Sequence, residues 1–502
     1  MCGVFGYCAD HWDAGLLPFF YTQGLYLQHR GYENCGFAYS NGHFVEEVFK
    51  GEGKVSQVFN ERRREQFSLF RPLIALGHTR YATAGSVRSR CAQPHWAEYK
   101  GSRYALASNG DLPLLAKERS FLEEQGIMIV SGVDEAGNCV VPNDGEIILR
   151  KILFFADQKE GDIEAAIKMM METTEGAYSS ALMTKDKLYL FRDPDGFRPL
   201  VFGKWRNVNV FASESCAFHD PESRVEREVK PGELVIFDIN GHVRTKQLVP
   251  SKKHLQPCPF ELFYFSRPDS MIFGTGEDEL YAVRYKLGRQ LAKEAPVLGA
   301  YVVGIPLSGI PASRGYAREF NLEHKDLYLG DPEAGRTFIT AGEGNRRRKA
   351  RLKYSVMPSL LKSLIGKVRS GEIDKARLVI VDDSIVRLTT LSELINMVKE
   401  LWAKLSGRPE DLEIHVRIPS PPIKGPCYYG IDTPTYEELI AANYSVEEIR
   451  DLLDVNSLHY LSIEGMTGVF SEYSGLMSGQ KDLCLACFLD QYPTPVERRR
   501  RN

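Results

Sequence analysis

The sequence predicts an α+β half built from stacked antiparallel sheets, followed by an α/β half built around an open parallel sheet. Up to about residue 240, short β-rich runs are separated by glycine-containing turns. From about Leu262 onward, apolar strands alternate with helices, and the apolar run at 377–381 is typical of a parallel strand buried on both faces. We therefore expect three regions, at residues 2–240, 260–445 and 446–502, the last being a helical tail with a Cys-x-x-Cys pair.

The composition is ordinary for a soluble globular enzyme. The 502 residues are 43% hydrophobic and 26% charged, and the net charge of −3 argues against a general nucleic-acid binder. No apolar run approaches the roughly 18 residues of a membrane span, and no secretory signal opens the chain. The ten cysteines are mostly scattered and do not look like a disulfide framework. These features predict a cytoplasmic protein.

The elements of the first half follow from its apolar runs. We expect a helix at 16–27 and strands at 73–76, 104–107, 181–183, 188–191 and 233–237. Polar, glycine-containing segments follow the first three of these runs, at 28–36, 77–83 and 108–111. This arrangement favours antiparallel sheets over a helical bundle.

Cys2 is the residue with the clearest chemical potential in this half. Its small side chain favours removal of Met1, which would leave Cys2 with both a thiol and a free α-amino group. The amine titrates at about 8 and the thiol at about 8.5, so a neutral amine is accessible as a built-in general base at neutral pH. Taken alone, the same pattern also fits a chance cysteine at the start of a strand.

The second half has the element order of an open α/β sheet. Strands are expected at 300–305, 377–381 and 414–418, and helices at 311–320 and 391–401. Ligands of such sheets bind at the carboxyl ends of the strands. The candidate residues beyond the strand at 377–381 are Asp382, Asp383, Ser384, Arg387, Thr389 and Thr390.

These residue types suit a sugar phosphate. The two carboxylates can accept hydrogen bonds from ribose hydroxyls, while loop N–H groups and the helix dipole hold a phosphate. The same pattern would also fit a metal-binding acidic pair or a helix cap. Near the end of the chain, Cys484 and Cys487 alone would fit either a redox pair or part of a zinc site.

Residues 2 to about 240 resemble the glutaminase domain of the class II glutamine amidotransferases, a branch of the N-terminal nucleophile hydrolases with a four-layer αββα sandwich. The matching segments, in order, are CGVFG, QHRGYENCG, GHTRYATAG, SNGD, NDGE, RDPDGFRPL and ASES. The resemblance implies that Cys2 attacks the side-chain amide of glutamine and that Asn109 and the Gly110 N–H stabilise the oxyanion. It also implies that Arg80 binds the substrate carboxylate and Asp144 its ammonium group.

Two positions in this half depart from the family pattern. The family usually has His-Asn-Gly-Asn where this chain has Ser108-Asn109-Gly110-Asp111, and a serine or threonine where Gly145 stands. The residues assigned to catalysis are kept.

The segment from Asp382 to Thr390 resembles the phosphoribosyl pyrophosphate (PRPP) motif of the type I phosphoribosyltransferases. Flanking segments, FYFSRPDS, GRTFI, SPPI, YYGIDTPTYEELIA and CLAC, are similar to those of the glutamine PRPP amidotransferases. That resemblance covers nearly the whole chain. It implies that glutamine and PRPP are converted to 5-phosphoribosylamine, glutamate and pyrophosphate, with Mg²⁺ at Asp382 and Asp383.

Four departures fall on the expected PRPP site. The family has glycine at Leu388, usually serine at Leu391, and an acidic residue at Leu307, and it has basic residues that are replaced within 330–332. Leucine at position 388 would add roughly 1 kcal/mol of strain if the loop needed a positive φ there. We therefore expect weaker PRPP binding than the family pattern implies. The segments 336–339 and 346–349 are expected to close over the site, although the basic run 346–349 equally fits a solvated loop.

The same resemblance implies an iron–sulfur subclass and a homo-oligomer, with a tetramer as the family pattern. Cys258, Cys427, Cys484 and Cys487 lie in the contexts that hold a [4Fe–4S] cluster in that subclass, whereas zinc would use the same ligands. Two alternatives to PRPP amidation stay open. One is a glutaminase coupled to a different phosphosugar or nucleotide acceptor, and the other is a degenerate regulatory paralogue, which the retention of Asp382 and Asp383 disfavours.

Overall fold

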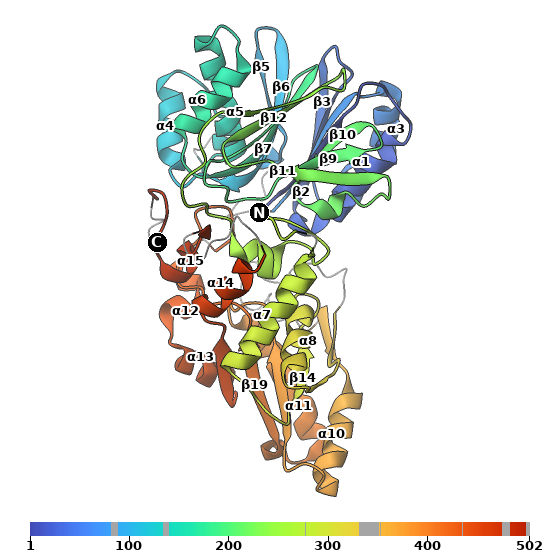
Figure 1. Ribbon diagram of the computed structural model, residues 1–502, viewed down its shortest axis with the longest axis vertical. Coiled ribbons are helices and arrows are strands. Elements are labelled where there is room, and N and C mark those ends of the chain that lie inside the picture. The colour runs from blue at the N-terminus through green and yellow to red at the C-terminus, as the bar shows by residue number, and fades with distance from the viewer. Residues whose placement is uncertain are drawn as a thin grey trace.

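The first half of the chain is a sandwich of two antiparallel sheets (Figure 1). The computed structural model describes residues 1–81, 89–133, 140–276, 278–330, 351, 353–433, 435–473 and 482–497. Within them, one sheet has seven strands, in the order β11 (Ser223–Glu228), β9 (Val201–Trp205), β10 (Val208–Ala212), β1 (Gly3–Cys8), β4 (Ile74–Arg80), β2 (Asn34–Ser40) and β3 (Val45–Glu52). The other has six, in the order β13 (Val243–Gln247), β12 (Glu233–Asp238), β8 (Lys187–Arg192), β7 (Ala177–Met183), β6 (Ser102–Asp111) and β5 (His95–Tyr99).

Three apolar cores separate the layers of this sandwich. Side chains alternate along β1: Val4 and Cys8 belong to the core between the two sheets, whereas Phe5 and Tyr7 face the helices. The outer helices on that side are α1 (Leu16–Tyr26), α2 (Val55–Val58) and α3 (Glu61–Phe70). The six-stranded sheet is covered by α4 (Leu115–Glu124), α5 (Asp144–Gln158) and α6 (Ile163–Thr173). The four-layer αββα arrangement is confirmed.

The second half is an open parallel sheet with helices on both faces, as expected. Its strands are β15 (Glu323–His324), β14 (Tyr301–Gly304), β18 (Ala376–Val381), β19 (Leu412–Ile418) and β20 (Ser457–Tyr460), in that order across the sheet. Along β18, Leu378 and Ile380 face one core and Val379 and Val381 the other, which explains why the run is apolar at every position.

The helices of this half divide between the two faces. On one face lie α7 (Leu280–Glu294), α8 (Ile310–Glu319) and α14 (Ile463–Ser471), and on the other α10 (Pro358–Ser370), α11 (Thr389–Ser406) and α13 (Val446–Leu453). The short elements are the antiparallel pair β16 (Tyr328–Gly330) and β17 (Tyr354–Val356), with α12 (Ile440–Asn443) and α15 (Ala486–Leu489). Among the described residues, no helix is both long and apolar enough to cross a bilayer.

Residues 446–473 differ from the expected helical tail. They include β20, which completes the parallel sheet by pairing with β19, and α13, which packs into the same core as α11. The short segment 457–460, with the sequence SLHY, lies between two helical segments and becomes a strand because the edge of β19 offers it backbone partners. This segment therefore belongs to the parallel-sheet unit.

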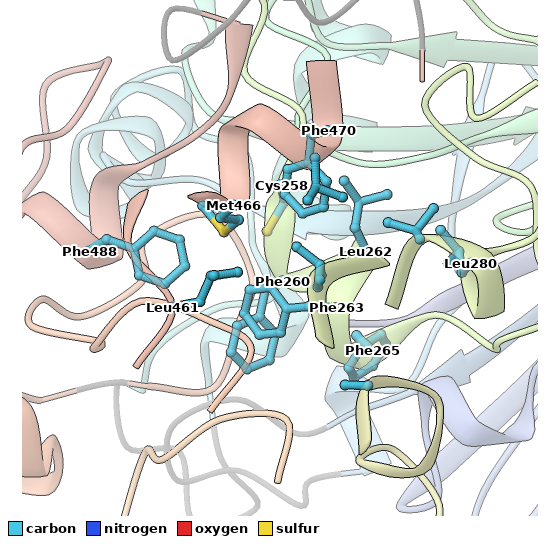
Figure 2. Close-up of a cluster of buried hydrophobic side chains, with 14 of the residues drawn as sticks. Cys258, Phe260, Leu262, Phe263, Phe265, Leu280, Leu461, Met466, Phe470 and Phe488 are labelled. Carbon is cyan, nitrogen blue, oxygen red and sulfur yellow. The ribbon is translucent and has the colours of Figure 1, made fainter. Parts of the chain in front are cut away.

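An apolar cluster joins the two halves (Figure 2). It unites Cys258, Phe260 and Phe263, from the segment that follows the sandwich, with Met466 and Phe470 of α14 and Phe488 of α15. The amino terminus lies at the same junction (Figure 1). Because β1 begins directly after Cys2, the central strand of the sandwich carries Cys2 to the boundary with the parallel-sheet unit.

Candidate active site

Cys2 is held on both sides of its backbone. Its nitrogen donates a hydrogen bond to Asn109 Oδ1 at 2.9 Å, and its carbonyl oxygen accepts one from Arg30 Nε at 2.7 Å. The Cys2 side chain is half-buried. The nitrogen that becomes the α-amine on removal of Met1 is therefore already fixed beside Asn109.

Met1 is enclosed in the folded chain. Its side chain is 2% exposed, and Arg198 Nη1 lies 2.8 Å from its sulfur. Burial lowers the pKa of its terminal amine. A residue at this position thus fills space at the junction between the two halves.

Asn109 and Gly110 lie near the end of β6, beside Cys2. Asn109 is wholly buried, and its Nδ2 group has no hydrogen-bond partner among the described residues. A buried amide donor without a partner is costly unless a ligand satisfies it. Gly110 has to be glycine, since a Cβ there would lie 1.8 Å from the carbonyl oxygen of Ala177 on β7.

Arg80 and Asp144 place opposite charges near this site. Arg80 ends β4, is 4% exposed, and donates from Nη1 to Asn34 Oδ1 at 3.1 Å. Asp144 begins α5, and its Oδ2 has no partner among the residues that the structure describes. Burial raises the pKa of Asp144 well above its usual value; the charges of Asp111 and Cys2 add to the rise, and that of Arg80 opposes it.

The two departures from the family pattern are structurally connected. Gln93 Oε1 accepts a hydrogen bond from the Ser108 backbone N–H at 2.6 Å, and Ser180 Oγ donates to Ser108 Oγ at 2.8 Å. A Cβ at Gly145 would lie 2.9 Å from the same Gln93 oxygen. The glycine at 145 thus leaves room for Gln93, which in turn supports the backbone before Asn109.

A buried ionic network joins the segment between α1 and β2 to the segment that follows the sandwich. Arg30 is wholly buried and donates to both oxygens of Glu261, at 2.8 and 3.1 Å, as well as to Glu214. His29 Nε2 lies 2.7 Å from Glu214 Oε1. Sequence reasoning did not assign these roles, although Glu214 lies in the ASES segment and Arg30 in QHRGYENCG. The positions are too far apart in sequence for the pairing to be read from it.

A pocket of about 540 Å³ lies where the two halves meet, at the carboxyl edge of the parallel sheet. All six residues expected to bind a phosphosugar line it: Asp382, Asp383, Ser384, Arg387, Thr389 and Thr390. His29 and Tyr32 line it from the first half. The pocket is therefore shared between the sandwich and the parallel-sheet unit.

The acidic pair is supported by hydroxyl groups. Asp383 accepts hydrogen bonds from Ser308 Oγ at 2.5 Å and from Ser384 Oγ at 2.7 Å. Burial, followed by the neighbouring charge of Asp383, raises the pKa of Asp382 well above its usual value. Thr389 begins α11, whose N-terminus has no side-chain cap, so its free N–H groups are available to an anion in the pocket.

Leu388 differs from the expectation in both its backbone conformation and the direction of its side chain. Its φ of −67° and ψ of −21° lie in the right-handed helical region, so leucine adds no strain there. Its side chain packs against the core beneath α11 and does not line the pocket. Leu391, which is buried, and Leu307, which is 75% exposed, do line it. The replaced residues at 331–332 and the segments 336–339 and 346–349 lie outside the described residues.

The four cysteines Cys258, Cys427, Cys484 and Cys487 are close enough to affect one another electrostatically. Burial raises the pKa of the Cys258 thiol to about 11, and Cys427 adds to the rise. The pKa of Cys487 is raised well above its usual value by burial and then by the other three. Cys427 Sγ accepts hydrogen bonds from the backbone N–H groups of Tyr429 at 3.3 Å and Ile431 at 3.4 Å.

The residue types at these four positions suit a metal centre. A [4Fe–4S] cluster takes four cysteine thiolates, and zinc uses the same ligand type. Among the described residues, no three His, Cys, Asp or Glu side chains are placed to hold a single metal ion.

The fold and these two sites define a glutamine amidotransferase in which an N-terminal nucleophile sandwich is joined to a phosphoribosyltransferase-type sheet. A scan of protein-family models found no match. The amidophosphoribosyltransferase of Archaeoglobus fulgidus is 36% identical over 497 residues, which cover 99% of this chain and 98% of that protein. Amidophosphoribosyltransferase 2, chloroplastic, of Arabidopsis thaliana is 38% identical over 99% of this chain and 80% of its own length.

Solved structures agree with the sequence comparison. Glutamine PRPP amidotransferase from Bacillus subtilis, complexed with ADP and GMP, aligns with a TM-score of 0.81 and 32% identity, covering 99% of this chain and 98% of that one. This chain belongs to the amidophosphoribosyltransferase family.

Proposed function

We propose that the chain transfers the amide nitrogen of glutamine to PRPP, giving 5-phosphoribosylamine, glutamate and pyrophosphate, the first step of purine synthesis. The observation that carries the proposal is the unpartnered Nδ2 donor of Asn109, placed beside the Cys2 backbone in a chain that also forms a phosphosugar pocket. A glutaminase alone would not need the pocket, and a phosphoribosyltransferase alone would not need Cys2.

In the proposed glutaminase step, the Cys2 amine accepts the proton of its thiol, and the sulfur attacks the amide carbon of glutamine. Asn109 Nδ2 and the Gly110 N–H donate to the oxyanion. The tetrahedral intermediate collapses to a thioester and releases ammonia, and water then hydrolyses the thioester to glutamate. Arg80 and Asp144 bind the carboxylate and ammonium groups of the substrate, whose charges are opposite to theirs.

In the proposed transfer step, Asp382 and Asp383 accept hydrogen bonds from the ribose hydroxyls, and the N-terminus of α11 holds the 5′-phosphate. These carboxylates offer the oxygen ligands that Mg²⁺ prefers, and the ion, when bound, would neutralise the departing pyrophosphate. Internal passage of ammonia is supported by two adjacent residues that contact the two sites. His29 lines the pocket, and the next residue, Arg30, donates to the Cys2 carbonyl oxygen.

We also propose that Cys258, Cys427, Cys484 and Cys487 hold a [4Fe–4S] cluster that ties the end of the chain to both halves. Anaerobically purified protein should contain iron and inorganic sulfide in equal amounts and be brown. Stoichiometric zinc without sulfide would contradict the cluster. The protein is further proposed to act in the cytoplasm as a homo-oligomer, with a tetramer as the first expectation, to be measured by light scattering.

A second candidate is amination of a different phosphosugar or nucleotide. The 75% exposed side chain of Leu307, at the wall where the family has an acidic residue, is the observation that favours it. Glutamate release from glutamine, measured with and without PRPP and Mg²⁺, separates the candidates. Stimulation by PRPP with formation of pyrophosphate supports the first, whereas hydrolysis unaffected by PRPP supports the second.

A further inference from the structure

The turn that follows β19 reaches from the parallel-sheet unit into the glutaminase site. We define it as residues 427–431. It folds around one sulfur, because Cys427 Sγ accepts the N–H groups of both Tyr429 and Ile431. The turn is therefore part of the four-cysteine site as well as part of the junction between the halves.

Two side chains of the sandwich hold this turn in place. The ring of Tyr429 stacks on Phe197, with centroids 4.2 Å apart and planes at 14°. Arg198 Nε donates to the Tyr429 carbonyl oxygen at 2.9 Å, and Arg198 Nη2 donates to the same atom. Both Phe197 and Arg198 are wholly buried. The position of the turn against the sandwich is thus fixed on the side next to β7.

Gly430 is the point of closest approach between the turn and the glutaminase site. Its φ of +107° is one that side chains rarely adopt, and a Cβ there would lie 2.9 Å from the oxygen and 3.0 Å from the carbonyl carbon of Gly110. Gly110 cannot move toward β7, because its backbone already packs tightly against Ala177: a Cβ on Gly110 would lie 1.8 Å from the Ala177 carbonyl oxygen. Its backbone is therefore clamped between β7 and Gly430.

We propose that Gly430 is a positioning residue for glutamine hydrolysis. By allowing the 427–431 turn to press on the carbonyl group of Gly110, it fixes the backbone of that residue and, with it, the N–H that receives the oxyanion. The close approach is to the oxygen and the carbonyl carbon of Gly110. The proposal rests on the proposed role of Gly110, and it makes the glutaminase transition state depend on an element of the acceptor half. An oxyanion donor acts only when it is held at the right place before the charge develops.

Gly430→Ala tests the proposal, with Gly161→Ala as the matched control. Gly161 has a similar φ of +99°, and nothing lies within 4 Å of a Cβ placed there, so alanine brings the same backbone cost without the clash. We expect Gly430→Ala to lower kcat for glutamine hydrolysis roughly tenfold or more, with KM within about twofold, because binding is kept and only the transition state loses support. Gly161→Ala should leave both constants unchanged.

Three further measurements separate positioning from general damage. Iron and sulfide content, and the rate of Cys2 alkylation, should match the wild type in both variants. Hydrogen exchange of the 108–111 segment should be faster in Gly430→Ala alone. If Gly430→Ala does not fold, Phe197→Leu takes its place, since it removes the stacking on Tyr429 but keeps an apolar side chain, and the same split between kcat and KM is expected.

Equal kcat in Gly430→Ala and Gly161→Ala, or unchanged exchange at 108–111, would overturn the inference while leaving glutamine hydrolysis by the wild type in place. Absence of glutamate release from the wild type would instead refute the proposed function. The exchange measurement needs no turnover, so it still decides in that case whether Gly430 braces Gly110.

Discussion

Asn109→Ala is expected to lower kcat for glutamine hydrolysis by about 10²- to 10³-fold through the oxyanion alone. The Nδ2 donor of Asn109 is buried and has no partner among the described residues, so it is available to the charge that forms in the transition state. Removing one such donor costs about 2.7–4 kcal/mol in comparable enzymes. Loss of the 2.9 Å bond from the Cys2 nitrogen to Oδ1 adds about 0.5–1.5 kcal/mol.

Asn109→Asp separates these two contributions. Aspartate keeps an oxygen for the Cys2 amine but has no donor, and its charge would repel the oxyanion. We therefore expect it to lose at least as much kcat as Asn109→Ala, as measured by glutamate release under saturating glutamine. Near-wild-type kcat in Asn109→Asp would show that the residue serves only to hold Cys2, and the oxyanion argument would then be wrong.

Cys2→Ala should abolish glutamate release, measured in a coupled assay. A residue before Cys2 that cannot be removed should do the same, because it converts the α-amine that acts as general base into an amide. Normal glutamine hydrolysis by either variant would exclude the N-terminal nucleophile mechanism. Asp144→Asn should raise KM for glutamine. Burial raises the pKa of Asp144 in the folded state, so ionisation of this carboxyl opposes folding at any pH above its unfolded-state pKa of about 3.8. Asp144→Asn should therefore also have a higher melting temperature than the wild type at pH 7, and the difference should vanish below about pH 4. A lower melting temperature of the variant at pH 7 would contradict this expectation. Leu307→Asp should strengthen PRPP binding, measured by calorimetry with Mg²⁺ present, whereas Leu388→Gly should not, since Leu388 faces the core. Stronger PRPP binding by Leu388→Gly alone would contradict the position of Leu388 described above.

The strands and helices were largely predictable because their periodicity is local. The apolar run at 377–381 became β18, and the run at 188–191 became β8, each within one residue of the expected bounds. The six expected phosphosugar residues could also be grouped from sequence, since residues that follow one parallel strand share the same sheet edge. β20 was missed because a four-residue run gives no periodic signal and depends on the edge of β19.

The sequence by itself determined the chemistry available to this protein: a thiol at position 2, an Asn-Gly pair to receive an oxyanion, and an acidic pair after a buried strand. The tertiary structure alone decided what these groups face. It turned Leu388 toward the core because the first turn of α11 is right-handed there, and it paired Arg30 with Glu261, 231 residues later in the chain. It also brought Gly430 against Gly110. Such contacts are absent from local patterns because each depends on how separate parts of the fold pack together. That packing is set by apolar cores that sum many weak contacts over the whole chain.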